Sequence, residues 1–562
     1  MNIDNEPWKA DYIEACNYCN TGEYEKALLK INKVLSFDKN IIPARNLKAS
    51  VLIDSWNGDP HTRKNIFEAI AHLKAIIEKD PENKKIYSMN LGNAYYQLAK
   101  NDLEAEGKLN PEIINDLEKA KKCFQESLSI CEDQPAVWIN KGNTLDYLGR
   151  YFEALYCYDR AVLLNPRHYN AWGNRGICCW TLSKLVEDNE DKKKLYRDSM
   201  VYLAIELKLY PSLEINDFYK KLVNDFIQQN EVLVDLETTL KEQLPKKRTI
   251  VEERFNLYSE QSGSFKDFYF NFCEMHNLFL NTHFDCNNCG RSNSDTINIS
   301  FISGINDQIR PYKFFKKWYS LIDDYKTARF FLTLAQYRHP DFLFMDNPRY
   351  ESDYSLNYYL NVEILKDAFL IAFNIYDKVA FLINDYEELG LKDENVSFWD
   401  GKSTLTIKGN LMEKEEYNKN IVALFSIKKE IEKEEFTKIK EIRNLIAHRY
   451  FILHDIGGVE NSNYHMDIQD FFKSTLYMLL QLKNILFSLS FFITEKENHK
   501  REIAEKEGEI IPSLEWVHDW EKDDEITKIA NKLEKELGEA TDEFISNIFE
   551  IMNKKSDEHK KQ

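Results

Sequence analysis

The chain has 562 residues, of which 74 are basic and 93 acidic, and its formal net charge is −19. One hydrophobic core rarely organises a chain of this length, so about two to four domains are expected. The charge excludes a general polyanion binder, because the overall field repels nucleic acid. Any contact with RNA therefore requires a local basic site.

Cysteine usage and the apolar segments predict a cytoplasmic protein. The ten cysteines show no disulfide framework, and residues 1–10 contain no apolar signal segment. The longest apolar run, 485–493, is interrupted by Ser488 and Ser490 and is too short to span a bilayer. We therefore expect free thiols in a reducing compartment and no membrane attachment. No cofactor is expected.

Residues 1–215 contain a helical pattern that repeats every 34 positions. Trp138 and Trp172 have this separation, and so do Gly142 and Gly176. The copy that begins at Trp138 continues with small, aromatic and helix-ending residues: Gly142, Ala154, Tyr158, Ala161 and Pro166. Weaker copies flank it, two of them with insertions around 102–115 and 186–194, which gives about five repeats.

This pattern resembles the tetratricopeptide repeat (TPR). In that family small residues let the two helices of a repeat approach, aromatic side chains fill the groove, and proline ends the second helix. Ordinary helical hairpins are the alternative, but they do not account for the full set of spaced residues. The resemblance implies an α-solenoid whose concave face binds a protein or peptide.

Residues 216–340 are predicted to form a linker and a small mixed α/β region. The stretch 297–302 has β-strand character, whereas 312–337 has helical periodicity. Neither stretch carries a motif with an obvious chemical role. The role of this region does not follow from the sequence.

Two half-sites in this region have a spacing that occurs in structural zinc sites. Cys273 and His276 form one, and Cys286 and Cys289 form the other. The alternative places the first pair on an amphipathic helix and the second in a loop. One pair of half-sites does not outweigh this alternative, so no metal site is favoured.

Residues 341–500 are predicted to fold as a helical bundle. Apolar residues recur at three- and four-residue intervals in four stretches: 358–389, 418–427, 434–453 and 467–494. Such helices bury their apolar faces by packing side by side. Residues 501–562 are charged and favour a helix, and their apolar stripe predicts a tail that docks on the rest of the chain.

The predicted helix over 434–453 contains the sequence Arg-Asn-Leu-Ile-Ala-His at positions 443–448. A helix turns by about 100° per residue, so the apolar residues of this stretch face the core and Asn444 and His448 lie on the opposite side. Arg443 lies about 140° from His448 around the helix. The two side chains therefore flank one polar groove without touching.

Arg-x4-His with a polar residue directly after the arginine resembles the signature of HEPN ribonucleases. Arg443, Asn444 and His448 match it position by position. The resemblance implies a metal-independent endoribonuclease in which the ribose 2′-OH attacks the adjacent phosphate, leaving 2′,3′-cyclic phosphate and 5′-OH ends. His448 is then the general acid or base, and Arg443 stabilises the phosphorane charge. Asn444 orients His448 or the phosphate.

Members of this family usually dimerise so that two motifs face each other. One helix does not bring Arg443 and His448 together, whereas a two-fold pair does. The resemblance therefore implies a homodimer, or a higher oligomer, with a composite site. Lys440 and Arg449 are candidate RNA-binding residues because they add positive charge to the same helix.

Two further features resemble HEPN proteins. His448-Arg449-Tyr450 is similar to an extension of HEPN toxins whose tyrosine is adenylylated by a partner nucleotidyltransferase antitoxin. Tyr450 falls almost on the helical line of Arg443, and the favoured alternative is a tyrosine packed at the helix end. Leu278–Asn281 is similar to a segment of a bacterial family that joins TPR repeats to a C-terminal HEPN domain.

The chain is thus predicted to be mainly α, with a TPR α-solenoid, a small mixed α/β middle region and a C-terminal HEPN helical bundle. The first functional hypothesis is a toxin-like ribonuclease in antiphage defence, regulated through the TPR array. The alternative is a non-catalytic TPR/HEPN scaffold that binds a protein partner or nucleotide, with ordinary solvated side chains at the motif. The intact pair of Arg443 and His448 favours the ribonuclease, and the global acidity favours the scaffold.

Overall fold

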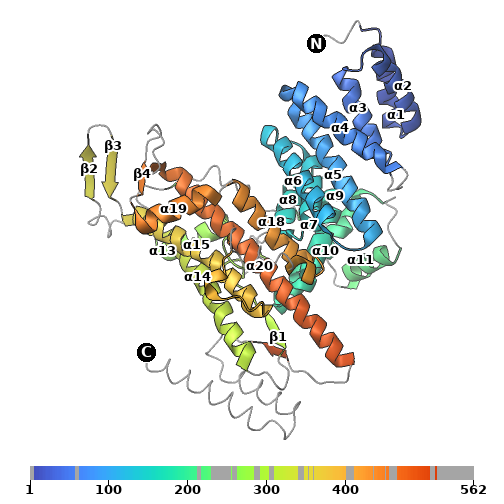
Figure 1. Ribbon diagram of the computed structural model, residues 1–562. Helices are drawn as coiled ribbons and strands as arrows, with labels where there is room; N and C mark the ends of the chain where they lie inside the picture. The colour runs from blue at the N-terminus through green and yellow to red at the C-terminus, as the bar shows by residue number, and fades with distance from the viewer. Residues whose placement is uncertain are drawn as a thin grey trace, which may run out of the picture.

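The structure of the protein is a computed structural model, shown in Figure 1. It describes residues 6–56, 62–211, 217–229, 239, 255, 263–283, 291–302, 309–338, 347–351, 354–358, 360–399, 411–434, 436–449, 451–454, 465–506 and 513–515. Helices dominate this part of the chain, and its strands occur in short two-stranded sheets. The fold is mainly α, with a helical array followed by a mixed region and a helical bundle, as predicted.

Antiparallel helix pairs, stacked side by side, form the N-terminal array (Figure 1). Over residues 9–209, where described, the pairs are α1 (Lys9–Asn20) with α2 (Tyr24–Phe37), α3 (Ile42–Asp54) with α4 (Arg63–Lys79), α5 (Lys84–Glu106) with α6 (Pro111–Ile130), α7 (Pro135–Tyr147) with α8 (Tyr151–Leu164), and α9 (Tyr169–Leu185) with α10 (Asn189–Leu209). A 3-10 turn, Pro81–Asn83, precedes α5, and α11 (Asp217–Gln229) packs on α10.

Glycines opposite large side chains explain why these helices pair so closely. A methyl group added at Gly142 of α7 would lie 2.5 Å from Cε1 of Tyr158 on α8. One added at Gly92 of α5 would lie 2.7 Å from Cε1 of Phe124 on α6. Each glycine therefore makes room for a ring of its partner helix, which is the packing that the 34-residue pattern predicts.

The insertion predicted around 102–115 lengthens both helices of its pair. α5 has 23 residues and α6 has 20, whereas α7 has 13 and α8 has 14. The added turns carry a small apolar cluster to which the C-terminal bundle contributes Val422; its buried members are Ala99, Leu109, Ile113, Leu117, Leu148 and Val422. The insertion thus extends the array onto the bundle.

The C-terminal bundle shares one hydrophobic core. Its helices are α13 (Phe265–Met275), α14 (Ile309–Gln336), α15 (Leu360–Tyr386), α17 (Leu411–Lys414), α18 (Lys419–Glu434), α19 (Phe436–His448) and α20 (Ile468–Lys506), with a 3-10 turn at Asp393–Asn395. Apolar residues of most of these helices pack together. α14 lies along α15, so part of the predicted mixed region belongs to this core.

Three short sheets occur in the part of the chain that the structure describes. β1 (Ser300–Ile302) pairs antiparallel with β6 (Ser513–Glu515), and β2 (Asn347–Glu351) pairs antiparallel with β3 (Tyr354–Tyr358). β4 (Ile452–His454) pairs parallel with β5 (His465–Asp467). β1 falls within the stretch of predicted strand character. The predicted tail beyond residue 515 lies outside the described residues.

The helix that carries the motif is shorter than predicted. α19 ends at His448 and residues 452–454 form β4, so the prediction of helix to residue 453 is wrong. The cause is a contact between separate segments, because Ile452 lies opposite His465 in the parallel pair. Tyr450 lies outside the described residues.

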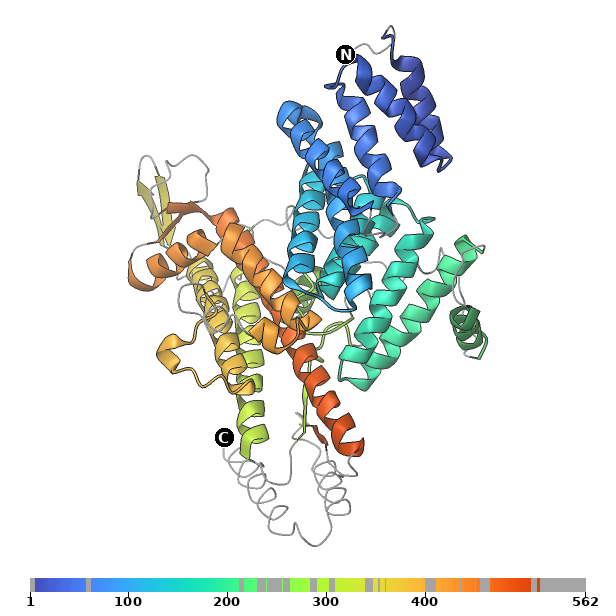
Figure 2. The same ribbon diagram turned by 45° about the vertical axis from the view of Figure 1, so that its right-hand side comes forward.

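α20 is the central helix of the bundle (Figures 1 and 2). By length and composition it is able to cross a membrane, but 83% of its apolar window is buried inside the protein. It packs against α15 and α18, and on the array side Phe487 lies with its ring 4.6 Å from that of Phe152 on α8. Burial of this kind is the property of a core helix.

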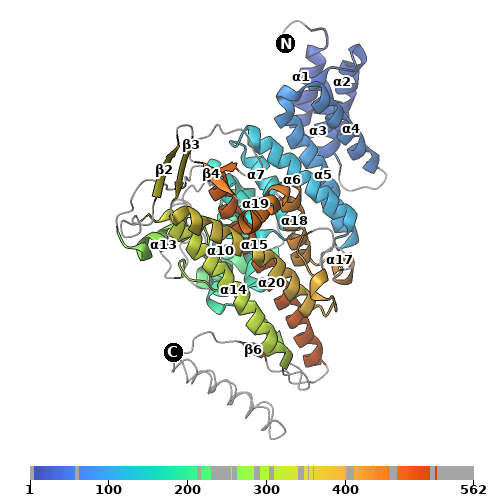
Figure 3. The ribbon, with the colours of Figure 1, turned by 60° about the vertical axis from the view of Figure 1, so that its left-hand side comes forward.

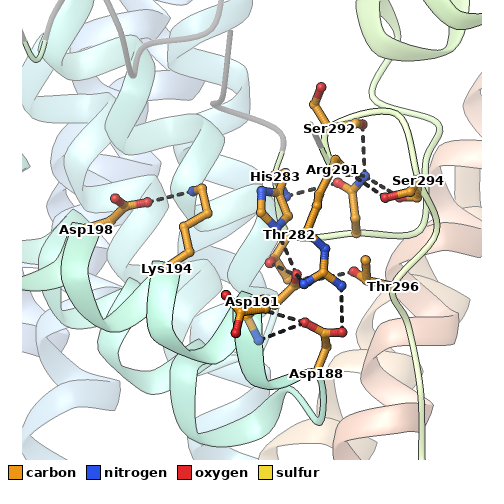
Figure 4. A network of polar contacts seen from close by, with 12 residues as sticks. Asp188, Asp191, Lys194, Asp198, Thr282, His283, Arg291, Ser292, Ser294 and Thr296 are labelled. Carbon is orange, nitrogen blue, oxygen red and sulfur yellow. Dashed lines mark hydrogen bonds and ion pairs between the residues drawn. The ribbon is translucent and has the colours of Figure 1, made fainter. Parts of the chain in front are cut away.

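A connecting segment, residues 278–299 where described, joins the array to the bundle (Figure 4). The carboxylate of Asp191 on α10 accepts hydrogen bonds from Thr282 (3.0 Å) and Thr296 (2.6 Å). It also lies 2.8 Å from Nε2 of His283. Burial raises the pKa of Asp191, but these hydrogen bonds outweigh burial and lower it to about 2. Side chains of α14 and α20 bond backbone carbonyls of the same segment.

Candidate active site and its link to the repeat array

The motif lies in the last two turns of α19, on the surface of the bundle. Ile442 is 4% exposed, and Leu445 and Ile446 pack half-buried against the core. Asn444 and His448 are exposed. The side chains therefore divide into a core face and a polar face, as the helical arithmetic predicts.

Arg443 lies between these two faces and turns toward α15. Its Nη1 donates a hydrogen bond to Oδ1 of Asn444 at 3.0 Å. Its guanidinium carbon lies 5.7 Å from the ring centroid of Phe373. Over the residues described, the structure gives no hydrogen bond between Arg443 and His448. The structure thus brings Arg443 and Asn444 together and leaves His448 separate within one chain.

The candidate RNA-binding residues also lie on the exposed side. Lys440 and Arg449 are exposed, and they stand before and after the motif on the chain. The backbone N–H of Arg449 donates to the Leu445 carbonyl at 2.9 Å, which closes the last turn of α19. Tyr450, the predicted modification site, lies outside the described residues.

A pair of histidines directly follows the motif helix, and the sequence reasoning missed it. Nε2 of His454 on β4 and Nδ1 of His465 on β5 form a hydrogen bond, and the two rings are nearly parallel, with an interplanar angle of 19°. Burial, and then electrostatic interaction with His465, lower the pKa of His454. Only the pairing of β4 with β5 places these residues together, so no local pattern reveals them.

The predicted zinc half-sites are only partly described. Cys273 is buried, its sulfur lies 3.5 Å from Oγ1 of Thr333, and burial raises the pKa of its thiol to about 11. The ring of His276 lies 4.4 Å from that of Phe272. Cys286 and Cys289 lie outside the described residues. Within the described part of the chain, no group of three or more His, Cys, Asp and Glu side chains is arranged to hold a metal ion.

α18, the helix that precedes α19, is held by the repeat array (Figure 3). Glu430 of α18 accepts a charged hydrogen bond from Nη1 of Arg150 at 2.6 Å and one from Nζ of Lys121 at 3.0 Å. Burial raises the pKa of Glu430, but these two cations lower it well below the usual range. Arg150 and Lys121 also bond Ser426. The network joins residues about three hundred positions apart in sequence.

The backbone of the array approaches α18 closely at one glycine. Gly149, in the turn between α7 and α8, has a φ of +76°. A methyl group added there would overlap the backbone carbonyl of Lys419, the first residue of α18. Nearby, the Lys419 ammonium lies 5.6 Å from the ring centroid of Tyr147. The array therefore contacts α18 along its length, and one residue separates α18 from α19.

The first helices of successive repeats carry paired asparagines. Nδ2 of Asn90 donates to Oδ1 of Asn46 at 2.9 Å. Nδ2 of Asn140 donates to Asn93 at 2.9 Å, and that of Asn174 donates to Asn143 at 2.8 Å. Each pair links two neighbouring repeats. Asn90 also donates to the Ser50 hydroxyl, and Asn143 also accepts from the Tyr158 hydroxyl, so part of the hydrogen-bonding capacity of the carboxamides is used within the array.

Two family models match the chain. One, described as LA2681-like HEPN, matches residues 306–496, and the other, the tetratricopeptide repeat, matches residues 135–168. The first match begins at the start of α14 and ends within α20. The second covers α7 and α8, the pair that contains the glycine and tyrosine contact described above.

A curated relative, a STIP1 homolog protein of Dictyostelium discoideum, is 30% identical over 166 residues. The match covers 26% of this chain, and the chain spans only 28% of that relative. A solved TPR protein of Thermus thermophilus, TTC0263, is 13% identical over 39% of this chain and 99% of its own, with a TM-score of 0.30. YrrB, described as a TPR protein with an unusual peptide-binding site, is 17% identical over 38% of this chain and 90% of its own, with a TM-score of 0.24.

The family matches agree with the packing of each part. Residues 135–168 have the repeat sequence and the glycine contacts of a TPR, and residues 306–496 include the helices that surround the motif. The chain therefore joins a tetratricopeptide repeat array to an LA2681-like HEPN domain.

Proposed function

We propose that this chain is an endoribonuclease whose active site is formed by Arg443, Asn444 and His448 of the HEPN domain. One observation carries the proposal. Asn444 and His448, which match the HEPN signature, are exposed on α19, and Arg443 lies half-buried beside them, while the other face of that helix is buried in the core. This arrangement leaves the polar groups free to meet a phosphodiester without unfolding the bundle.

In the proposed reaction the ribose 2′-OH attacks the neighbouring phosphate. The bond between phosphorus and the 5′-oxygen of the next nucleotide breaks, and that oxygen leaves as a hydroxyl. His448 takes the proton from the hydroxyl or gives one to the leaving oxygen, because imidazole does both near neutral pH. Arg443 donates N–H groups to the phosphate oxygens as negative charge builds up on them. The need for a 2′-OH restricts the reaction to RNA.

We propose that the complete site requires two copies of the chain. Within one copy Arg443 bonds Asn444 and stands about 140° around the helix from His448. In a two-fold dimer with the two α19 helices facing each other, Arg443 of one copy meets His448 of the other. Larger assemblies can be built from such dimers. Lys440 and Arg449 would then line both sides of the RNA path and offset the acidity of the chain.

The proposed role of the TPR array is to regulate this site by binding a protein or peptide. Support comes from the contact of Arg150 and Lys121 with Glu430, because α18 leads directly into α19. A change in the array therefore acts on the helix next to the motif. We propose a cytoplasmic, toxin-like effector of antiphage defence, and adenylylation of Tyr450 by a nucleotidyltransferase is a second proposed control.

Replacing His448 by alanine is expected to abolish RNA cleavage and the toxicity of the chain on expression. A loss of about a hundredfold or more in rate is the usual effect of removing a general acid or base. The measurement is cleavage of a labelled RNA in EDTA, with the ends identified as 2′,3′-cyclic phosphate and 5′-OH. His499→Ala in α20, outside the motif, is the control variant. Cleavage that stops in EDTA would contradict the metal-independent mechanism.

A second candidate function is a non-catalytic scaffold, and the paired asparagines favour it. They provide a row of neutral polar groups suited to hold an extended peptide backbone. In this case the HEPN domain dimerises or binds a nucleotide, and the motif side chains are simply solvated. Wild-type protein that neither cuts RNA nor harms cells with any trigger would support the scaffold over the ribonuclease.

A further inference from the structure

A cluster of four aromatic rings lies beside Arg443, and we call it the aromatic shelf. It consists of Phe373 and Tyr376 of α15 and of Phe398 and Trp399 in the turn after the 3-10 helix. Phe373 and Trp399 stack, with ring centroids 5.2 Å apart and an interplanar angle of 20°. Tyr376 lies 5.0 Å from Trp399 and 5.1 Å from Phe398. The four rings therefore form one contiguous block.

The shelf is fixed to α15 by hydrogen bonds as well as by packing. The Asp377 carboxylate accepts one from the hydroxyl of Ser397 and one from the backbone N–H of Phe398, both at 2.9 Å. The Tyr376 hydroxyl donates to the Met478 carbonyl of α20 at 3.2 Å. Because hydrogen bonds tie the shelf to both α15 and α20, its rings have little freedom to move.

Arg443 rests on the edge of this shelf. Its guanidinium lies 5.7 Å from the centroid of Phe373, which is only 5% exposed. A cation within about 6 Å of an aromatic face is attracted by the ring quadrupole. The hydrogen bond to Asn444 uses one of the five N–H groups of the guanidinium. The contact with the ring and the bond to Asn444 together restrain the orientation of the remaining donors.

We propose that Phe373 is a positioning residue that holds the Arg443 guanidinium in the orientation needed to bind phosphate. The inference rests on the proposed ribonuclease function. Phe373 is buried and acts on the reaction only through Arg443. A guanidinium already held in place loses less freedom when it binds a phosphate, so its contribution to the transition state is larger.

The test compares two leucine substitutions in α15. Phe373→Leu removes the ring beside Arg443, whereas Phe369→Leu removes an equally buried ring one turn earlier, which contacts Phe471 and not Arg443. Both leave a similar cavity, so both should lower stability by a similar amount. Phe373→Leu alone is expected to lower kcat about 5- to 30-fold, the range that corresponds to a cation–π contact. Phe373→Tyr, which keeps the aromatic face, should restore most of the rate.

The outcomes separate this inference from the function on which it rests. Wild-type chain that cuts RNA, with Arg443→Ala inactive and Phe373→Leu impaired in kcat at unchanged KM, supports both. Equal rates for Phe373→Leu and Phe369→Leu in an active enzyme overturn the positioning role and leave the function intact. An inactive wild type rejects the proposed function and this inference together.

Discussion

At the scale of the residue, the array buries a carboxyl group where a glycine makes room for it. Glu206 of α10 is 8% exposed, and its carboxylate lies where a methyl group at Gly173 of α9 would be. Burial raises the pKa of Glu206 to about 7. Asp191, on the same helix, has its pKa lowered instead, because hydrogen-bond donors surround it. The two carboxyl groups therefore differ in charge state near neutral pH.

Replacing Glu206 by glutamine is expected to change how the free energy of unfolding depends on pH. In the unfolded chain a glutamate titrates near ~4.3, below the folded value of about 7. The protonated form thus contributes stability that is complete below about pH 4 and is lost as the pH rises through 7. Glu206→Gln should be more stable than wild type above this range, by on the order of 1–3 kcal/mol.

Urea unfolding at about pH 5 and about pH 8 measures this difference. Glu190→Gln serves as the control because Glu190 is exposed on the same helix. Glu190 pairs with Lys193, so Glu190→Gln should change the free energy of unfolding by a similar amount at both pH values. If Glu206→Gln also differs from the wild type by a similar amount at both pH values, the carboxyl does not titrate in the folded chain as described.

At the scale of the element, α18 is shared between two parts of the molecule. One side of it belongs to the HEPN core, and Glu430 and Ser426 on another side bond the array. The proposed regulation requires a change in the array to move this helix, and packed helices move as rigid bodies. α19 follows after one residue, which places the motif next to this shared helix.

Gly149→Ala is expected to weaken the contact between the array and α18. The alanine must adopt a positive φ and its methyl group must displace the Lys419 carbonyl. Gly107→Ala is a matched control, because Gly107 has a φ of +73° but open space around its Cα. Gly107→Ala should lower the free energy of unfolding by about 1 kcal/mol, from backbone strain alone. Gly149→Ala should lower it by more, because its methyl group also overlaps the Lys419 carbonyl.

Hydrogen exchange distinguishes the two variants. Gly149→Ala should increase exchange in α18 and α19, whereas Gly107→Ala should leave both helices protected as in the wild type. Equal exchange in α18 for the two variants would show that the array does not hold this helix.

The elements that the sequence predicted are those set by local patterns. Gly142 and Tyr158 revealed their repeat because their spacing follows from helix pairing within a few turns. The sides of α19 followed from helical periodicity in the same way. The predicted end of α19 was wrong because the true end depends on the pairing of β4 with β5. The bond between Arg150 and Glu430 and the contact of Arg443 with Phe373 join segments that no local pattern connects.

At the scale of the whole molecule, the chain combines a strongly acidic composition with a small basic surface near the motif. The net charge of −19 repels RNA, while Lys440, Arg443 and Arg449 stand within ten positions on α19 and just after it. When two copies of the chain face each other, their basic surfaces lie together and attract RNA more strongly, although the composition of the chain is unchanged. The proposed dimer would therefore serve both the charge balance and the assembly of the site.

The composite site predicts that two inactive variants restore each other. Chains with Arg443→Ala keep His448, and chains with His448→Ala keep Arg443. In a mixed dimer one of the two composite sites is then intact. Each variant alone should be inactive.

Equal mixing of the two variants, with exchange of subunits, followed by measurement of RNA cleavage tests the central claim most directly. Half of the dimers are then mixed and each has one working site, so about a quarter of the wild-type activity is expected. A mixture as inactive as either variant alone, under conditions in which the wild type cuts RNA, would contradict a site shared between two chains.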